Sequence, residues 1–256
     1  MTGFSAADLT IDGFLGGRLM VAQPRYGYRA ATDPVLLAAA TPARSGQSVL
    51  ELGCGVGVAS LCLLHRLPDL AVTGLERQAD YAELAQQNSR RNNLPLTVLT
   101  GDLGNAPPSL RRESFDHVIA NPPYFRAGGG TAAQDPGRES AQREETPLGI
   151  WVDAALRRLK PGGWLTMIHL AERLPDLLVA SHDRAGSAEI LPVAAREGRA
   201  ASRIILRLRK GGKAPARLLP PLVLHDGSHH RVDGDDFTAL ARAVLRDGAA
   251  LPNFDL

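Results

Sequence analysis

The fold is decided by residues 48–57, Ser48-Val49-Leu50-Glu51-Leu52-Gly53-Cys54-Gly55-Val56-Gly57. An apolar run of strand length enters a loop with glycine at every second position, and the pattern predicts a helix over about residues 59–66. Such glycines let the backbone turn tightly and approach a ligand, with helix N–H groups at the mouth of the turn. Val58 stands where the last glycine of G-x-G-x-x-G would be, and no G-K-[ST] follows, so the loop is not a P-loop. The stretch predicts a nucleotide-like ligand at the first strand-to-helix turn.

The next two predicted strands each end in an acidic residue. Residues 71–75 are followed by Glu76, and residues 96–101 by Asp102. Glu76 is placed to accept the hydroxyls of a ribose, with a solvated strand-end acid as the alternative. Asp102, or the N–H of Leu103, is placed to meet the edge of an adenine ring. Because strands alternate with helices, the pattern predicts a parallel sheet that binds its ligands at the carboxyl ends of the strands.

A fourth predicted strand, residues 116–120, runs into Asn121-Pro122-Pro123-Tyr124. Each proline fixes φ and lacks an N–H, so the chain leaves the strand extended and rigid, with free carbonyl oxygens. The Asn121 amide oxygen and the Pro122 carbonyl can accept the two hydrogens of an exocyclic NH2 group, while Tyr124 stacks on the ring that carries it. The other interpretation is a strand-ending turn with a surface tyrosine.

Two further segments flank these motifs. Residues 1–30 carry glycine among apolar and aromatic residues, which predicts short strands at the edge of a domain. Thr32-Asp33-Pro34 then predicts the start of a helix, and Asp33 either caps that helix or faces a ligand. Residues 126–147 break the pattern and predict a long loop directly after Tyr124.

Composition bounds the class of protein. The chain has 256 residues, of which 44% are hydrophobic, enough for one sizeable core. The net charge is +2, so overall charge says little about partners. The sequence has no signal-peptide pattern and no apolar run of about 18 residues, so a cytoplasmic protein without a membrane anchor is expected. The histidines at residues 225–230 have no zinc-ligand spacing, so no metal is expected.

Basic residues gather near the C-terminal end of the sheet. From Arg196 to Arg217 there are eight basic residues and one acid, Glu197. Four of them lie on or next to the strand predicted at residues 202–209, namely Arg203, Arg207, Arg209 and Lys210. A basic stripe on the outer face of one strand is the pattern expected of a surface that binds an RNA backbone. A solvated sheet edge is the alternative.

Together these motifs resemble the class I S-adenosylmethionine-dependent methyltransferases. The resemblance rests on residues 51–57, Glu76, Asp102 and the Asn-Pro-Pro-Tyr motif, and it covers about residues 12–245. It implies an α/β, Rossmann-like class I methyltransferase fold: a mostly parallel seven-stranded sheet with helices on both faces and a small N-terminal β/helix extension. The implied division is an extension over residues 1–45 that packs on a methyltransferase domain over residues 46–256.

Within this class the chain is similar to the bacterial tRNA (adenine-N6) methyltransferases that act on a valine tRNA. Residues 29–37, the Lys160-Pro161-Gly162-Gly163 turn and residues 221–227 carry this finer resemblance. S-adenosylmethionine is the implied cofactor, with its methionine part on the glycine loop, its ribose on Glu76 and its adenine at Asp102. The residues implied to bind it are Asp33, Glu51, Gly53, Gly55, Gly57, Glu76, Asp102, Leu103 and Asn121. The implied catalytic residues are Asn121, Pro122 and Tyr124, and the implied RNA contacts are Pro123, Tyr124, Arg203, Arg207, Arg209 and Lys210.

The expected reaction moves a methyl group from S-adenosylmethionine to the exocyclic N6 of an adenine in RNA, with tRNA as the expected substrate. An aryl NH2 is a poor nucleophile because its lone pair is delocalised, and two acceptors on its hydrogens stabilise the positive charge that develops on nitrogen. The alternatives are a protein glutamine-N5 or rRNA guanine-N2 methyltransferase, and a catalytically inactive scaffold that binds cofactor or RNA. The oligomeric state, monomer or homodimer, stays open.

Overall fold

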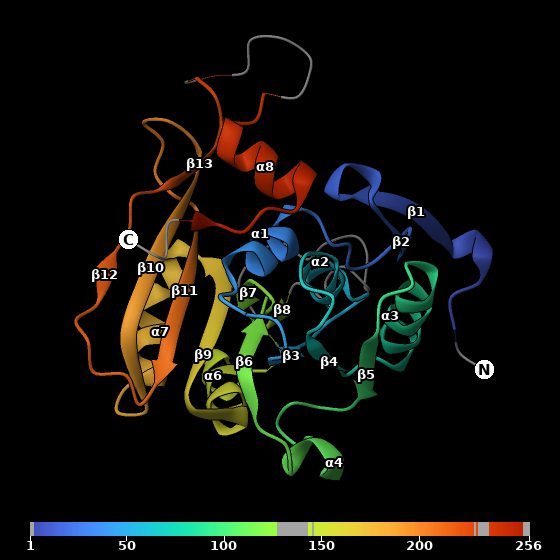
Figure 1. Cartoon of the computed structure of the whole chain (residues 1–256), viewed down its shortest axis with the longest axis horizontal. Helices are drawn as coiled ribbons and strands as arrows, with labels where there is room; N and C mark the ends of the chain where they lie inside the picture. The colour runs from blue at the N-terminus through green and yellow to red at the C-terminus, as the bar shows by residue number, and fades with distance from the viewer. Residues whose placement is uncertain (1–2, 127–142, 145, 228, 230–235, 253–256) are drawn as a thin grey trace.

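The computed structural model describes residues 3–126, 143–144, 146–227, 229 and 236–252. At its centre is a nine-stranded sheet in the order β12-β10-β11-β9-β6-β3-β4-β5, with β13 also paired to β10 (Figure 1). The strands are β3 (Ser48–Leu52), β4 (Ala71–Glu76), β5 (Leu96–Thr100), β6 (Phe115–Ala120), β9 (Leu159–Leu170), β10 (Ala185–Arg196), β11 (Arg203–Lys210), β12 (Arg217–Leu218) and β13 (Leu222–His225).

The sheet is mostly parallel. Strands β5, β4, β3, β6 and β9 run in one direction, and β11 lies antiparallel between β9 and β10. The short strands β12 and β13 pair in parallel with β10 and extend the seven long strands that the sequence predicts. The expected α/β class is therefore confirmed, and the strand ends that carry the motifs meet at one edge of the sheet.

Helices cover both faces of the sheet (Figure 1). Successive residues of a strand point to opposite faces, so Val49 belongs to one hydrophobic core and Leu50 to the other. The first core is built with α1 (Thr32–Ala40), α2 (Val58–Arg66), α3 (Ala79–Arg91) and α8 (Ala239–Asp247). The second core is built with α6 (Leu148–Arg158), α7 (Leu174–Ser181) and the short α4 (Pro108–Arg111).

The N-terminal segment forms its own antiparallel hairpin of β1 (Leu9–Phe14) and β2 (Leu19–Pro24). Asn88 of α3 fastens this hairpin to the rest of the molecule. Its side chain accepts from the Ala22 N–H at 2.8 Å, and donates to the carbonyls of Ala22 and Val56, both at 3.0 Å. The hairpin thus packs on α3 and the glycine loop, while a domain boundary at residue 45 stays a prediction.

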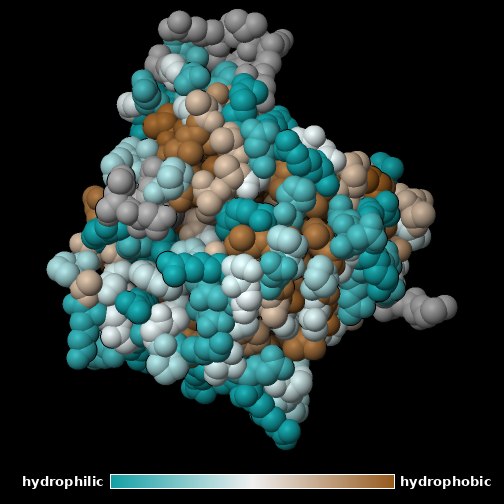
Figure 2. Space-filling view, viewed as in Figure 1, coloured by the Kyte–Doolittle hydropathy of each residue, from teal (hydrophilic) through white to brown (hydrophobic). Residues whose placement is uncertain are grey.

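The face of the molecule viewed in Figure 1 is largely polar. In Figure 2 hydrophilic side chains predominate on the face viewed in Figure 1, and hydrophobic side chains gather in smaller patches. Within the described ranges, no helix is long and apolar enough to cross a membrane. After the Asn-Pro-Pro-Tyr motif, β7 (Phe125–Arg126) pairs with β8 (Arg143–Glu144). Most of the predicted loop between them lies outside the described residues.

Candidate active site

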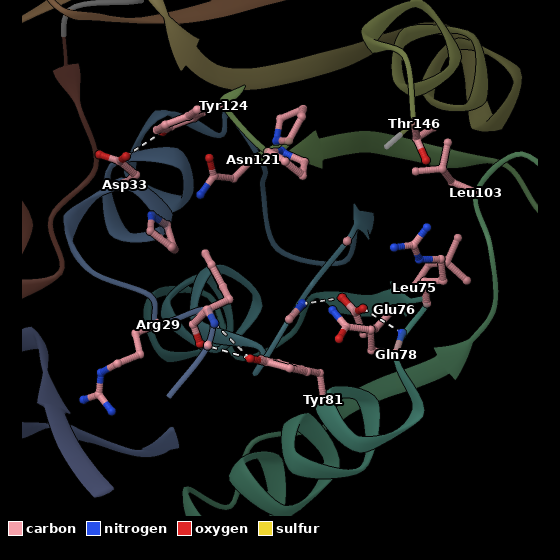
Figure 3. Close-up of a pocket in the computed structure, with 18 of the residues that line it drawn as sticks. Arg29, Asp33, Leu75, Glu76, Gln78, Tyr81, Leu103, Asn121, Tyr124 and Thr146 are labelled. Atoms are coloured by element: carbon pink, nitrogen blue, oxygen red, sulfur yellow. Dashed lines mark hydrogen bonds between the residues drawn. The ribbon is translucent and has the colours of Figure 1, made fainter. Parts of the chain in front are cut away.

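A cavity of about 680 Å³ opens at the carboxyl ends of β3, β4, β5 and β6 (Figure 3). The loop before α1, residues of α1, α3 and α6, and one residue of β11 also line it. The predicted site residues that line the cavity are Asp33, Gly53, Gly55, Glu76, Asp102, Leu103, Asn121, Pro122, Pro123, Tyr124 and Arg203. The predicted site residues outside its lining are Glu51, Gly57, Arg207, Arg209 and Lys210.

The glycine loop keeps its shape through positive φ angles. φ is 64° at Gly53, 53° at Gly55 and 90° at Gly57, in the left-handed region that residues with side chains rarely adopt. A Cβ on Gly53 would lie 2.6 Å from the Trp151 ring, and a Cβ on Gly55 would lie 3.2 Å from the Tyr28 ring. Gly57 is the N-cap of α2 and does not line the cavity. Gly53 and Gly55 therefore present bare backbone to the cavity, which fits the close approach of a ligand, whereas Gly57 shapes the helix start.

The two strand-end acids brace the loops around them. The Gly55 N–H donates to Oε2 of the buried Glu76 at 2.9 Å, and the Gln78 N–H donates to its Oε1 at 2.9 Å (Figure 3). Asp102 accepts from the Gly104 N–H at 2.8 Å. A carboxylate offers about four acceptor sites, so both acids keep capacity for hydroxyl or N–H groups of a ligand. Glu76 also links the glycine loop of β3 to the end of β4.

Glu51 lies behind the glycine loop. The N–H and the hydroxyl of Ser60 both donate to its Oε2, at 3.0 and 2.5 Å. Burial raises the pKa of this carboxyl to about 8, against the lowering effect of the Ser60 hydrogen bonds. Glu51 lines a small neighbouring cavity with Gly53 and Asn121. In the structure Glu51 joins the end of β3 to the start of α2. Its contact with a cofactor stays a prediction.

Asn121 carries an unpaired acceptor. Its Oδ1 is buried and has no hydrogen-bond partner among the described residues. Buried acceptors almost always have a partner, so an orphaned one is the position that a ligand NH2 group would satisfy. Pro122 follows directly, and its ring fixes the chain beyond the amide. Together with the bare backbone of the glycine loop and the carboxylates of Glu76 and Asp102, this set of groups fits a nucleoside that carries an amino acid part.

Tyr124 is held by a charged pair that the sequence does not predict. Its hydroxyl donates to Oδ2 of Asp33 at 2.5 Å (Figure 3). Nε of Arg203 donates to the same oxygen at 2.9 Å. The Tyr124 ring also packs on His169, with 5.2 Å between ring centroids. Burial and the neighbouring carboxylate raise the pKa of Tyr124, so its phenol is a proton donor at neutral pH. Asp33 makes no capping hydrogen bond to α1, whose N-cap is Ala31, so the capping interpretation is wrong.

The expected basic stripe does not form on one outer face. Arg207 is buried, lies 4.7 Å from the centroid of the Trp164 ring and pairs with Glu189 at 3.3 Å. The interpretation of Arg207 as an outward RNA contact is therefore wrong, because a carboxylate and an indole enclose its guanidinium. Arg209 and Lys210 remain at least partly exposed, and each donates to a backbone carbonyl, at 3.1 and 2.7 Å. Their contact with RNA stays a prediction.

His225, the last residue of β13, makes local contacts. Nδ1 of His225 lies 2.5 Å from Oδ1 of Asp236, and the His225 ring stacks on Phe237 at 4.9 Å between centroids. Across the residues that can be described, no group of three or more His, Cys, Asp or Glu side chains is arranged to hold a metal ion.

Several lining residues were not predicted from the sequence. Trp151 of α6 packs under Gly53, and its Nε1 is buried without a partner in the described part of the chain. The Tyr28 N–H donates to the Tyr81 hydroxyl at 3.0 Å, which ties the loop before α1 to α3. Residues 25–29 of that loop all line the cavity. The only sequence signal for this loop is the run of Arg and Tyr just before Asp33.

This fold, with a ligand cavity at the carboxyl ends of its parallel strands, defines a class I methyltransferase, whose cofactor is S-adenosylmethionine. The sequence matches the family described as the methyltransferase small domain over residues 31–174, and the chain belongs to this family. The expected class of protein is thus confirmed. The matched residues extend from the start of α1 to the end of β9 and exclude β10 and β11.

Comparison with individual proteins refines the relationship. The chain is 30% identical over 213 residues to a protein of Dickeya chrysanthemi named tRNA1(Val) (adenine(37)-N6)-methyltransferase, covering 80% of this chain and 82% of that protein. It is 29% identical over 163 residues to a release factor glutamine methyltransferase of Geobacter sulfurreducens, covering 60% and 56% of the two chains. Among solved structures, Atu636 of Agrobacterium tumefaciens, described as a predicted O-methyltransferase, superposes with a TM-score of 0.70 at 26% identity, covering 86% of this chain and 98% of that one.

Proposed function

We propose that this methyltransferase acts on the exocyclic N6 of an adenine in RNA, with tRNA as its substrate. The observation that carries the proposal is the buried Oδ1 of Asn121, which has no hydrogen-bond partner in the described part of the chain and lies beside Pro122 and the Tyr124 ring. The similarity to a protein named as an adenine-N6 tRNA methyltransferase over four fifths of both chains supports the same substrate. A tRNA substrate also supports a cytoplasmic location.

The cofactor half of the cavity is assigned to the first three strand ends. S-adenosylmethionine supplies an electrophilic methyl group on its sulfonium. The backbone at Gly53 and Gly55 receives the methionine part, and Glu76 accepts from the ribose hydroxyls while it keeps the loop in place. Asp102 and the Leu103 N–H meet the adenine edge. Glu51 acts from behind the loop by fixing β3 to α2.

The substrate half is assigned to the Asn-Pro-Pro-Tyr motif. The Asn121 Oδ1 and the Pro122 carbonyl accept the two N6 hydrogens, and Tyr124 stacks on the purine. Both acceptors stabilise the positive charge that grows on N6 as the new C–N bond forms and the C–S bond breaks. A proton then leaves N6 for solvent. Asp33 and Arg203 are positioning residues, because they hold the Tyr124 hydroxyl and so the plane of the ring.

A protein glutamine side chain is the second candidate substrate, since the chain is also similar to a release factor glutamine methyltransferase. An amide NH2 presents the same pair of hydrogens to Asn121 and Pro122. The longer match and greater coverage of the adenine-N6 relative favour RNA. A catalytically inactive scaffold is disfavoured, because binding alone would not need the Asn121 acceptor.

The test is methylation with labelled S-adenosylmethionine of two substrates, unmodified tRNA transcripts and a glutamine-containing release factor. Mass spectrometry of nucleosides and peptides identifies the methylated atom. N6-methyladenosine in tRNA, absent with Asn121→Ala, is the expected result. Methylglutamine in the protein without N6-methyladenosine in the RNA would overturn the proposal. Nucleoside analysis of bulk tRNA from a strain that lacks the gene would then identify the modified tRNA.

A further inference from the structure

The connection between β2 and α1, residues 25–29, forms one side of the cavity mouth. We call it the mouth loop. Tyr26 is 78% exposed and is the most exposed large hydrophobic side chain among the described residues. Arg25 beside it is also exposed and lines the cavity. An aromatic face and a positive charge therefore lie side by side in solvent at the entrance to the proposed active site.

The mouth loop is fastened on both sides of Tyr26. Arg29 donates to the Pro24 carbonyl at 2.6 Å and to the Asp12 carboxylate at 2.5 Å, and Figure 3 shows it directed away from the cavity, toward the N-terminal strands. Arg25 Nε donates to the Ala7 carbonyl at 2.9 Å. Through these contacts Arg29 holds the mouth loop in place. Tyr26 is the side chain of the loop that projects into solvent. Because the chain on both sides of Tyr26 is held, the loop backbone loses little conformational freedom when a flat partner stacks on the Tyr26 ring.

We propose that the mouth loop is a binding site for the nucleotide next to the target adenine, with Tyr26 stacked on its base and Arg25 near its phosphate. This inference rests on the proposed RNA substrate. A base that enters an enzyme cavity must leave its own stack, which also exposes a face of its neighbour. An aromatic side chain at the cavity mouth replaces the lost stack, and it does so for any base because every base has a π-face.

The charge distribution favours this loop over β11 as the contact next to the target base. Arg207 is enclosed by Trp164 and Glu189, and Arg203 is committed to Asp33. The guanidinium of Arg25 stays exposed at the cavity mouth. RNA whose target base reaches Asn121 enters a cavity that residues 25–29 line. An acidic peptide would gain charge attraction from Arg25, but neither an acidic nor a neutral peptide carries a base that Tyr26 could stack on.

The test measures equilibrium binding of a labelled RNA hairpin, with one adenine in its loop, to the full chain saturated with S-adenosylhomocysteine. Tyr26→Ala should weaken binding about tenfold and Tyr26→Trp should retain it, since the ring face is what binds. Val179→Ala is the matched control, because Val179 is 77% exposed and does not line the cavity. Arg25→Gln should lower the slope of log affinity against log salt by about 0.7, and Arg112→Gln, an exposed arginine away from the cavity, should not.

A second set of RNAs identifies the partner of the Tyr26 ring. Hairpins with an abasic site on the 5′ or 3′ side of the adenine are bound by wild type and by Tyr26→Ala. The proposal expects the tenfold effect of Tyr26→Ala to vanish with one of these RNAs, because the stacking partner is already gone. The proposal is overturned if Tyr26→Ala binds the intact hairpin as tightly as the wild type does. It is also overturned if Tyr26→Ala weakens the binding of both abasic RNAs equally.

The outcomes separate this inference from the proposed function. Tyr26-dependent binding of RNA that is never methylated at adenine would remove the adenine-N6 assignment and leave the mouth loop as an RNA site. If Tyr26→Ala methylates RNA and binds it as the wild type does, the mouth loop is not an RNA-binding site, and the adenine-N6 assignment stands. Tyr26-dependent binding of a glutamine peptide, with no binding of RNA, would overturn both. Unchanged cofactor affinity and melting temperature of Tyr26→Ala verify that the variant is folded.

Discussion

The two halves of the cavity are built in different ways. In the cofactor half, the contacts of the two strand-end acids join residues close in sequence or at the ends of adjacent strands: Glu76 to Gly55 and Gln78, and Asp102 to Gly104. In the substrate half, Tyr124 is held by Asp33 and Arg203, which lie 91 residues before it and on a strand beyond the matched family region. The first half is therefore assembled from strand-end turns that each hold their own shape. The second half depends on long-range packing, so changes far away in sequence can move its ring.

The largest effect is expected at Asn121, where the two halves meet. Asn121→Ala should lower the single-turnover methylation rate by about a hundredfold or more, because it removes a preorganised acceptor for the charge that develops on N6. Cofactor affinity, measured by calorimetry, should stay within about twofold, since the glycine loop and Glu76 are untouched. Near-normal turnover would reduce the motif to a structural turn.

A change at Glu76 should affect the cofactor half alone. Glu76→Ala removes the acceptor of the Gly55 N–H as well as the proposed ribose contact, so cofactor affinity should fall at least about tenfold. The rate at saturating cofactor should change much less. Glu83→Ala, an exposed acid on α3, is the control and should bind like wild type. Equal losses in cofactor affinity and in the methylation rate at saturating cofactor would show that a change in the cofactor half also affects the substrate half.

A change at the Tyr124 hydroxyl tests the substrate half, which depends on long-range contacts. Tyr124→Phe keeps the stacking face but loses the hydrogen bond to Asp33, and it should lower kcat/KM about tenfold, since a hydrogen bond to a charged group contributes roughly 1.5 kcal/mol at the lower end of its range. Asp33→Asn should cost a similar factor. If the two residues act as one unit, the double variant should be no slower than the slower single variant. Full additivity in this cycle would contradict a positioning role.

The smallest effect concerns stability and pH. The native pKa of Glu51, about 8, lies above its ordinary value of 4.5, so ionisation in the folded state is unfavourable. The stability of the wild type should therefore fall, relative to Glu51→Gln, as pH rises from 4.5 through about 8. Urea unfolding at pH 5 and pH 9 should show a gain in the free energy of unfolding of Glu51→Gln, relative to the wild type, at pH 9. An equal difference at both pH values would contradict the assignment.

The same contrast explains what the sequence could predict. The glycine loop, Glu76, Asp102 and the Asn-Pro-Pro-Tyr motif each lie at the end of a readable apolar strand, and the parallel arrangement brings strand ends to one edge. Their presence in the cavity lining agrees with that prediction, although their chemical roles still need the variants above. The fold class follows from the same alternation of strands and helices.

Pairings between distant strands could not be predicted in the same way. Ile204 and Leu206 are buried on one face of β11 and Ile205 on the other, so alternation does not identify an outer face for the arginines. Only the register with β10 brings Glu189 opposite Arg207 and makes that arginine a buried partner. The hydrogen bond from Arg203 to Asp33 likewise depends on where β11 enters the sheet. No sequence pattern near Asp33 predicts this contact.

The position of β11 also constrains the order in which the strands of the sheet can pair during synthesis. β10 leaves the ribosome before β11, yet β11 lies between it and β9. Until residues 203–210 have emerged, β10 has no place in the sheet and the edge of β9 stays open to any other strand. A chain interrupted after β10 would hold the whole matched family region and still expose that edge. During this interval the open edge of β9 is a site at which another strand can pair, and Arg203 reaches Asp33 only when the interval ends.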